Sequence, residues 1–369
     1  MPTLTARGCR LTDFLEVLAD RTDPTAYPHA AAIEHEVLIY DREGLLAAPD
    51  EELVHALSAG PGVVVVRGAY PDVSVVDAAT AEFEKLMAQQ RAAGLVVGDH
   101  FAKPGTNERV WNALEKLAVA APEVFVDYYA NPSIAKLANA WLGPAYQVTS
   151  QLNVVNPGGT AQSGHRDYHL GFLAAETVAR YPAHVQRLSP VLTLQGAVAH
   201  TDMPVESGPT MYLPHSQKYV PGYLAMNLPE FQAHFVEHHI QLPLRTGDAA
   251  FFNPAVFHGA GTNRSADIRR IANLLQISSA FGRAMESVDR TRVCAALYNA
   301  LAAHPHPEHA IAAAAEGYAF PTNLDRNPAV EGLSPPSQAD LVRQALAEGW
   351  AEDRFRTALD AHARLSETH

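Results

Sequence analysis

Short runs of β-branched and aromatic residues, each closed by a turn, fill the middle of the 369-residue chain from about residue 146 to about residue 280. Turn-forming clusters such as Pro157–Gly159, Glu206–Pro209 and Thr246–Asp248 separate these runs. A parallel β/α/β arrangement would need a helix between most strands, so this spacing favours an antiparallel barrel or a double-sheet jelly roll. The expected strands are Tyr146–Val155, Val191–His200, Thr210–Leu213, Gln241–Leu244, Ala249–Phe252 and Ile271–Ser278.

Helical periodicity flanks this β-rich segment on both sides. Before it, the valines at 63–66 predict one buried strand among helices, so the first third of the chain is expected to be α+β. After it, the chain returns to helices, interrupted by a Pro- and Asn-rich loop over 321–336. The predicted fold class is α+β, with a jelly roll flanked by N- and C-terminal helices. The expected helices are Asp13–Ala19, Pro49–Ala59, Asp77–Ala93, Val288–Ala303, Gln338–Leu346 and Asp353–Leu365.

The chain carries an excess of acidic residues. Lys and Arg number 27 against 40 Asp and Glu, a net charge of −13 that repels phosphate backbones and anionic lipid head groups. Neither nucleic acid nor a membrane is therefore an expected partner. Cys9 and Cys294 are the only cysteines, too few for a disulfide framework or a zinc-finger ligand set. The charged N-terminal segment is unlike a signal peptide, and these features together predict a cytoplasmic location.

The chemistry is concentrated in the histidines, because the sequence lacks a phosphate-binding loop, a Gly-x-Ser-x-Gly elbow and a paired-cysteine metal motif. His165 and Asp167 are two residues apart, so on an extended strand they project from the same face. His258 lies far enough downstream for the intervening strands to return it to this pair. Two histidines and one carboxylate on one face form the facial triad of non-haem Fe(II) oxygenases, which leaves three coordination positions open.

Two other combinations compete with this triad. His200 and Asp202 have the same spacing, but they stand where a strand gives way to a turn, which explains both residues without a metal. His234, Glu237 and His238 spell the H-x-x-E-H motif of one zinc peptidase class if the segment is helical. Zinc would need a further glutamate from a second helix, and no recognisable partner motif is present. We interpret this segment as the end of a helix that leads into a strand.

The stretch that begins at His258 reads HGAGTNRSADIR and favours the first combination. It resembles the phytanoyl-CoA dioxygenase family of Fe(II)/2-oxoglutarate oxygenases, in which the distal histidine opens a Gly-rich turn with an Asn and a Ser or Thr. In that family an arginine follows eleven residues later, and this spacing selects Arg269 over Arg270. Gln162 is similar to a glutamine often found ahead of the family's H-x-D motif, and Leu244–Phe252 resembles its Gly-Asp strand.

The resemblance runs from about Gln151 to Ser278 and departs from the family outside the metal triad. Glu206–Pro209 lacks the Asn of the family's N-G-P motif, and His215–Gln217 replaces Gly-Ser-His. Ala260 stands where a serine is common. Asp167 is a carboxylate and not the Ala or Gly of the family's halogenating relatives, which favours hydroxylation or a related oxidation.

The resemblance implies a double-stranded β-helix, a cupin-like jelly-roll barrel, and an Fe(II)/2-oxoglutarate-dependent dioxygenase. The metal would be Fe(II), the cosubstrate 2-oxoglutarate and the oxidant O₂, and the reaction would release succinate and CO₂ while it hydroxylates a C–H bond of a small organic substrate. Gln162 and Asn153 are expected to orient ligands or cosubstrate, although each is equally well explained as a strand-end polar residue. The resemblance assigns His165, Asp167 and His258 to the metal and Arg269 to the distal carboxylate of 2-oxoglutarate.

We expect residues 1–369 to form a single catalytic domain. Its parts would be a helical, α+β N-terminal part (1–145), the jelly-roll core with the metal site (146–280) and a C-terminal helical extension (281–369). Lys103, Trp111 and the pair Tyr168-His169 are candidates for the substrate entrance, and the helical ends are candidates for a lid or a homodimer interface. Two alternative functions remain open: the zinc peptidase, and a barrel of the same fold that binds a ligand without turnover.

Overall fold

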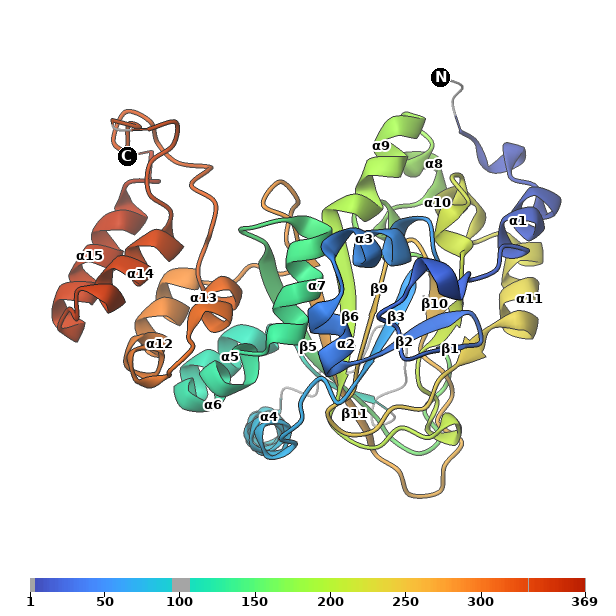
Figure 1. Cartoon of the computed structure of the whole chain (residues 1–369), viewed down its shortest axis with the longest axis horizontal. Coiled ribbons are helices and arrows are strands. Elements are labelled where there is room, and N and C mark those ends of the chain that lie inside the picture. The colour runs from blue at the N-terminus through green and yellow to red at the C-terminus, as the bar shows by residue number, and fades with distance from the viewer. Residues whose placement is uncertain (1–3, 95–106, 331, 369) are drawn as a thin grey trace.

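The structure, a computed structural model, describes residues 4–94, 107–330 and 332–368. Its centre is an eight-stranded sheet with the order β1-β2-β3-β9-β6-β11-β5-β4 (Figure 1). A smaller sheet, β10-β7-β8, lies against one face of the large sheet. The strands are β1 Ala32–Glu34, β2 Val37–Asp41, β3 Val63–Arg67, β4 Asn107–Val110, β5 Gln147–Val155, β6 Thr193–Ala199, β7 Met211–Leu213, β8 Ile240–Gln241, β9 Ala249–Phe252, β10 Phe257–Gly259 and β11 Arg270–Ser278.

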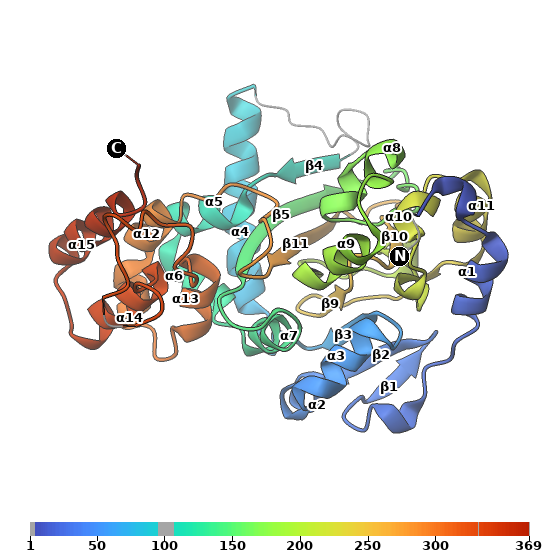
Figure 2. The same ribbon diagram turned by 90° about the horizontal axis from the view of Figure 1, so that it is seen from above.

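Helices cover the face of the large sheet that is turned away from the small one. Seen from above, α4 to α7 and α12 to α15 lie on one side of the large sheet, whereas α1, α8 to α11 and the small sheet lie on the other (Figure 2). The helices are α1 Leu11–Leu18, α2 Arg42–Ala47, α3 Asp50–Ser58, α4 Ser74–Ala92, α5 Ala113–Ala120, α6 Pro122–Tyr129, α7 Pro132–Leu142, α8 Ala175–Val178, α9 Ala183–Leu188, α10 Gly222–Ala225, α11 Pro229–His238, α12 Arg290–Ala303, α13 Glu308–Ala314, α14 Gln338–Ala347 and α15 Glu352–Arg364.

Alternation along β11 separates the helix-facing core from the interior between the sheets. Ile271, Leu275 and Ile277 pack in the large core with the helices, because side chains two apart on a strand share a face. Ala272 instead packs with residues of the small sheet, such as Tyr212. The inner face of β11 therefore borders the space between the two sheets.

The expected α+β jelly roll with helical ends is confirmed, and so are its long strands β5, β6 and β11. The strand expected over Gln241–Leu244 is reduced to Ile240–Gln241, because Pro243 has no N–H to donate and Leu244 makes only an isolated bridge with Met203. The strands β1, β2, β4 and β10 were not expected from the sequence. Strand β4 reads NERV and has no apolar alternation, yet it pairs with β5 along its whole length.

None of the helices in the described ranges combines the length and the apolar character that crossing a bilayer requires.

A buried polar network lies on the helix-facing side of β6. The ring of His200 is 3% exposed and is held between Thr80 Oγ1, 2.7 Å from Nδ1, and the Tyr128 hydroxyl, 2.8 Å from Nε2. Because Thr80 donates its own proton to the carbonyl oxygen of Val76, it accepts one from Nδ1, and Nε2 accepts the Tyr128 proton. Burial lowers the pKa of His200 to about 3, so the folded protein holds this imidazole in its neutral form.

This network predicts a loss of stability in mild acid. A histidine whose pKa is depressed in the folded state contributes its full stabilisation above its unfolded pKa of about 6.5 and loses it as the pH falls towards the folded value. In wild-type protein this one group accounts for a fall in the free energy of unfolding of about 2 kcal/mol between pH 7 and pH 5. Urea unfolding of His200→Asn should show a pH dependence smaller by that amount, whereas the exposed control His184→Asn should match wild type. If the free energy of unfolding of His200→Asn fell between pH 7 and pH 5 as much as that of wild type, the neutral, buried state assigned to His200 would be contradicted.

Candidate metal centre

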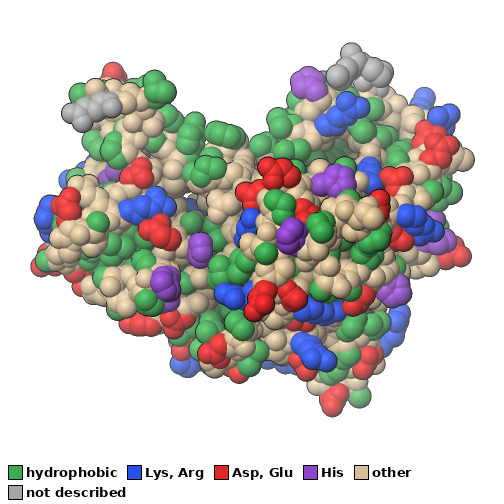
Figure 3. Space-filling view, in the orientation of Figure 1, with side chains coloured by type: hydrophobic (Ala, Val, Ile, Leu, Met, Phe, Trp, Pro, Cys, Tyr) green, Lys and Arg blue, Asp and Glu red, His purple; other side chains and the backbone are tan. Residues whose placement is uncertain are grey.

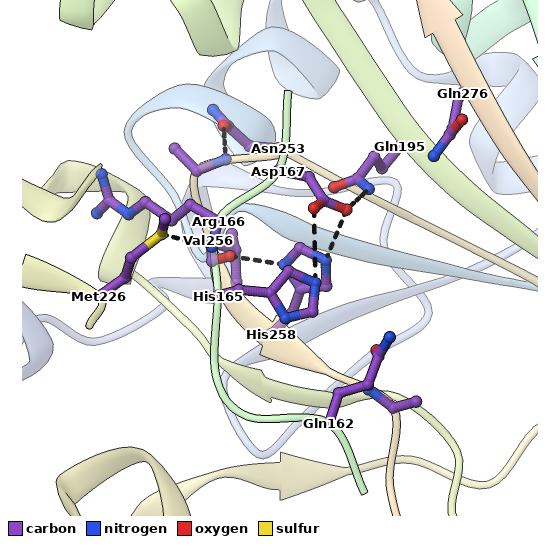
Figure 4. Close-up of polar contacts among 12 residues, drawn as sticks. Gln162, His165, Arg166, Asp167, Gln195, Met226, Asn253, Val256, His258 and Gln276 are labelled. Carbon is purple, nitrogen blue, oxygen red and sulfur yellow. Dashed lines mark hydrogen bonds and ion pairs between the residues drawn. The ribbon is translucent and has the colours of Figure 1, made fainter. Parts of the chain in front are cut away.

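Three potential ligands meet at the edge of the small sheet. His165 forms an isolated antiparallel bridge with His258 of β10, with N–O distances of 2.9 and 3.1 Å. Asp167 continues this pairing, since its backbone N–H donates to the carbonyl oxygen of Pro254 at 3.0 Å. Alternation then turns the side chains of His165 and Asp167 to the same side, and one ligand atom from each of the three residues lies within 4.8 Å of the others (Figure 4).

The backbone fixes how the two imidazoles present their nitrogens. His165 Nδ1 lies 2.9 Å from the carbonyl oxygen of Ser163, and His258 Nδ1 lies 2.9 Å from that of Val256. A carbonyl oxygen only accepts, so each Nδ1 carries the proton and each Nε2 keeps its lone pair. The Nε2 atoms of His165 and His258 lie 3.5 and 3.4 Å from the two Asp167 oxygens. This donor set fits a divalent metal, because neighbouring ligands about 2.1 Å from one ion are separated by roughly 3 Å.

The charges in this cluster are tuned for metal binding. Burial is the main cause that lowers the pKa of His165, which keeps the imidazole neutral at physiological pH. Burial acts to raise the pKa of Asp167, but the His165 and His258 rings and the Gln195 amide outweigh it and hold this pKa well below its usual range. The folded protein thus presents a neutral His165 and a charged Asp167, which are the protonation states that metal coordination requires of these two ligands.

Gln195 of β6 orients the carboxylate. Its Nε2 donates to Asp167 Oδ2 (Figure 4). Because an ionised carboxylate only accepts hydrogen bonds, the amide must turn its nitrogen, and not its oxygen, towards Asp167. The amide therefore holds one carboxylate oxygen in place, in the manner of the outer partners that support metal ligands. Gln195 was missed in the sequence analysis, and the only signal was an amide side chain inside an otherwise apolar strand.

The triad opens into a cavity of about 660 Å³ between the two sheets. Its wall includes Arg270, the first residue of β11, and Gln276, six residues further along the same strand. At about 3.3 Å per residue the two side chains start roughly 20 Å apart. Gln276 pairs in register with Gln195, so the metal cluster adjoins the Gln276 half of this wall.

The structure corrects the expected arginine. Arg269 does not line the cavity: its guanidinium pairs with Glu84 and Glu108 on the outside of the large sheet. Arg270 lines the cavity and is 5% exposed. Neighbours on a strand face opposite ways, so the register of β11 turns Arg270, and not the expected Arg269, towards the cavity.

The remaining predicted site residues take separate positions. Gln162 and Asn153 both line the cavity. Gln162 is tied to the residue that follows β10, because its Oε1 accepts the N–H of Ala260 at 3.0 Å. Asn153 lies on β5 beside Arg109, whose guanidinium also donates to Gln151 at 2.8 Å. Neither Arg109 nor Gln151 was expected at the site from the sequence.

The residues expected at the substrate entrance do not all line the cavity. Trp111 lines the cavity, with the Arg109 guanidinium 4.8 Å from its ring centroid. Tyr168 is buried, and His169 lines a separate pocket with Ser189. Lys103 lies outside the described residues.

Neither rival combination forms a ligand set. His200 points into the helix-facing network, whereas Asp202 accepts from the backbone and hydroxyl of Thr246. His234 and His238 stack on α11 with ring centroids 4.0 Å apart. Within the described parts of the chain, the only group of three such side chains placed to share an ion is His165, Asp167 and His258.

A profile of the family described as Phytanoyl-CoA dioxygenase (PhyH) matches residues 50–271, which is more than half of the chain. A comparison with curated proteins gives no match. Similar solved structures include two enzymes from nogalamycin biosynthesis, both described as non-heme alpha ketoglutarate dependent. The carbocyclase SnoK is 20% identical, with 66% of this chain and 89% of that chain covered and a TM-score of 0.48. The epimerase SnoN is 20% identical, with 63% and 83% covered and a TM-score of 0.41.

HygX from Streptomyces hygroscopicus, solved with nickel, 2-oxoglutarate and hygromycin B bound, is 14% identical; 62% of this chain and 87% of that chain are covered, with a TM-score of 0.40. These structural similarities are distant, so the assignment rests on the profile match. The matched stretch contains the metal cluster and the inward-facing Arg270. The chain therefore belongs to the phytanoyl-CoA dioxygenase family and is a non-haem iron, 2-oxoglutarate-dependent enzyme.

Proposed function

We propose that this protein is a dioxygenase that hydroxylates a C–H bond of a small organic substrate, with release of succinate and CO₂ from 2-oxoglutarate. His165, Asp167 and His258 would hold Fe(II). The observation that carries the proposal is one cavity that contains both this cluster and a buried arginine. When bound, the iron supplies the site at which O₂ is activated for the oxidation.

Arg270 is suited to bind the distal carboxylate of 2-oxoglutarate. Among the described residues, no carboxylate lies within ion-pair distance of its guanidinium, which donates to the carbonyl oxygen of Ser207 at 3.2 Å. Burial lowers the pKa of Arg270 to about 10, so the side chain is still charged at neutral pH. A planar guanidinium can hold a carboxylate at two points, and in a cavity shielded from water such a pair is strong.

The other half of the cavity is left for the substrate. Gln276 and Gln151 place amides on this part of the wall, and Trp111 and Phe172 add aromatic surface, whereas Asn153 pairs with Ala272 nearer to Arg270. Arg270 lies at the opposite end of β11, so cosubstrate and substrate would approach the metal from different ends. Asp167 would be the third protein ligand of the metal, which supports hydroxylation over halide transfer.

Loss of one ligand should abolish metal binding. His165→Ala removes one of three donors, so Fe(II) affinity should fall by more than the roughly 10–100-fold that follows loss of an outer partner. The control His234→Ala removes an imidazole on α11 and should keep full affinity. Anaerobic calorimetry measures the affinity, and succinate release with Fe(II), ascorbate and 2-oxoglutarate measures turnover. A metal dependence that follows His234 and not His165 would favour the zinc peptidase instead.

The two neighbouring arginines should differ in their effect on the cosubstrate. Arg270→Ala removes the buried cation and should weaken 2-oxoglutarate binding by about 2–5 kcal/mol, which is a loss of affinity of roughly tens-fold to thousands-fold. Arg269→Ala breaks only outer-face ion pairs with Glu84 and Glu108 and should leave this affinity within about twofold. Titration of 2-oxoglutarate into the anaerobic Fe(II) protein separates the two. Equal losses would contradict the assignment of Arg270.

Metal binding should depend on pH through the histidine ligands. The pKa of His165 is lowered, so protons begin to compete with the metal at this ligand only below its ordinary value of about 6.5. We expect an Fe(II) affinity that is nearly constant from pH 8 to pH 7 and that falls as the pH drops below about 6. Competition with a chelator across this range tests it. An affinity that already falls between pH 8 and pH 7 would contradict a lowered pKa at His165.

A further inference from the structure

Arg166 stands between two of the metal ligands and points the opposite way. His165 and Asp167 face the cavity, so alternation along this extended segment sends the Arg166 side chain to its far side (Figure 4). There it is 2% exposed, among the largest fully buried side chains of the protein. Burying a guanidinium is costly unless its charge and N–H groups are satisfied, so its surroundings call for an explanation.

Carbonyl oxygens and aromatic faces surround this cation. Its Nη2 donates to the carbonyl oxygens of Ser216 at 2.5 Å and Tyr219 at 3.0 Å. The ring centroids of Tyr223 and Phe257 lie 5.4 and 5.2 Å from its central carbon. In the part of the chain that the structure describes, no carboxylate lies within ion-pair distance of it, and its Nε has no hydrogen-bond partner. The guanidinium is therefore held by hydrogen bonds to carbonyl oxygens and by contacts with aromatic rings. These interactions depend on direction and close fit, so they fix the orientation of the side chain.

Gly222 completes the cage, which we define as Ser216, Tyr219, Gly222, Tyr223 and Phe257. A Cβ atom at position 222 would stand 1.8 Å from the central guanidinium carbon, so only glycine leaves room for it. The plane of the guanidinium is thus packed directly against the first residue of α10. Any side chain at this position would have to displace Arg166.

The cage contacts the backbone next to all three ligands. Arg166 itself adjoins His165 and Asp167, and the Tyr223 hydroxyl donates to the carbonyl oxygen of Asp167 at 3.1 Å. Phe257 precedes His258, and its N–H donates to the Ser216 hydroxyl at 2.7 Å. One buried side chain is therefore packed or bonded to both segments that carry the ligands.

We infer that Arg166 is a positioning residue for the metal centre: its caged guanidinium holds the His165–Asp167 segment against β10 and so sets the spacing of the three ligands. This inference rests on the proposed metal site. Because the cage acts on the strand from behind, it fixes the ligands without touching the metal, the cosubstrate or the substrate. Ligand atoms must be held to within about half an ångström for tight binding, which is the precision that such a support supplies.

The test compares metal affinity with folding stability. Arg166→Met keeps much of the side-chain volume but removes the bonds to Ser216 and Tyr219, and should weaken Fe(II) binding by about 10–100-fold. Arg290→Met is the matched control, because Arg290 also donates to backbone carbonyls, those of Ala313, Ala314 and Val148, but lies on α12 away from the ligands. It should lower the free energy of unfolding and leave the Fe(II) affinity within about twofold.

Two further variants keep the inference testable if Arg166→Met does not fold. Gly222→Ala retains the charge but displaces the guanidinium, and Arg166→Lys retains the charge but loses the planar fork. Both should weaken Fe(II) binding in the direction expected for Arg166→Met. The visible absorption spectrum of the Co(II)-loaded variants should also change, since it reports ligand geometry and not overall stability.

The possible outcomes separate this inference from the proposed function. If wild-type protein does not bind Fe(II), the proposed function fails and the inference with it. If wild-type protein binds Fe(II) and the folded Arg166 and Gly222 variants bind it equally well, with an unchanged Co(II) spectrum, the inference alone is overturned. The inference alone is also overturned if Arg290→Met weakens Fe(II) binding as much as the Arg166 and Gly222 variants do. Selective loss in those variants supports it.

Discussion

The isolated bridge between His165 and His258 is the constraint on which the site depends. Two backbone hydrogen bonds join a segment that follows β5 to the short strand β10, and this pairing puts both imidazoles and Asp167 on one side. Each histidine then donates Nδ1–H to a carbonyl oxygen two residues earlier in the chain, so its Nε2 can face only the shared centre. The geometry of the metal site is therefore largely a property of the backbone, and the side chains complete it.

The protein buries cations but keeps most of its many carboxylates outside. Arg166 is caged behind the ligands and Arg270 lies inside the cavity, and both donate to backbone carbonyls where a carboxylate could have neutralised them. On the outer surface, Arg269 pairs with Glu84 and Glu108 (the mixture of charges on one face is visible in Figure 3). A buried arginine without an acidic partner can bind an anion from solution, as we propose for Arg270, or hold a backbone in place, as we infer for Arg166.

Several parts of the fold and site could be predicted from sequence because their signals are local. The β-branched and aromatic runs of β5, β6 and β11 identify strands, and the His-x-Asp spacing identifies two ligands that must share a face. Strand β4 could not be predicted in this way, since its polar residues form a strand only because β5 offers an edge to pair with. Gln195 was likewise hidden, because nothing near it in sequence shows that Asp167 lies beside it.

The sequence by itself determined the chemistry: which side chains can bind a metal, and which turns and strands can carry them. The tertiary structure alone decided the register, and with it which of Arg269 and Arg270 faces the cavity and whether His200 or His165 meets a carboxylate. The physical reason is that side chains alternate along a strand, so a shift of one residue exchanges the two faces. That shift is set by cross-strand hydrogen bonds between residues far apart in the chain, such as Arg270 with Val155.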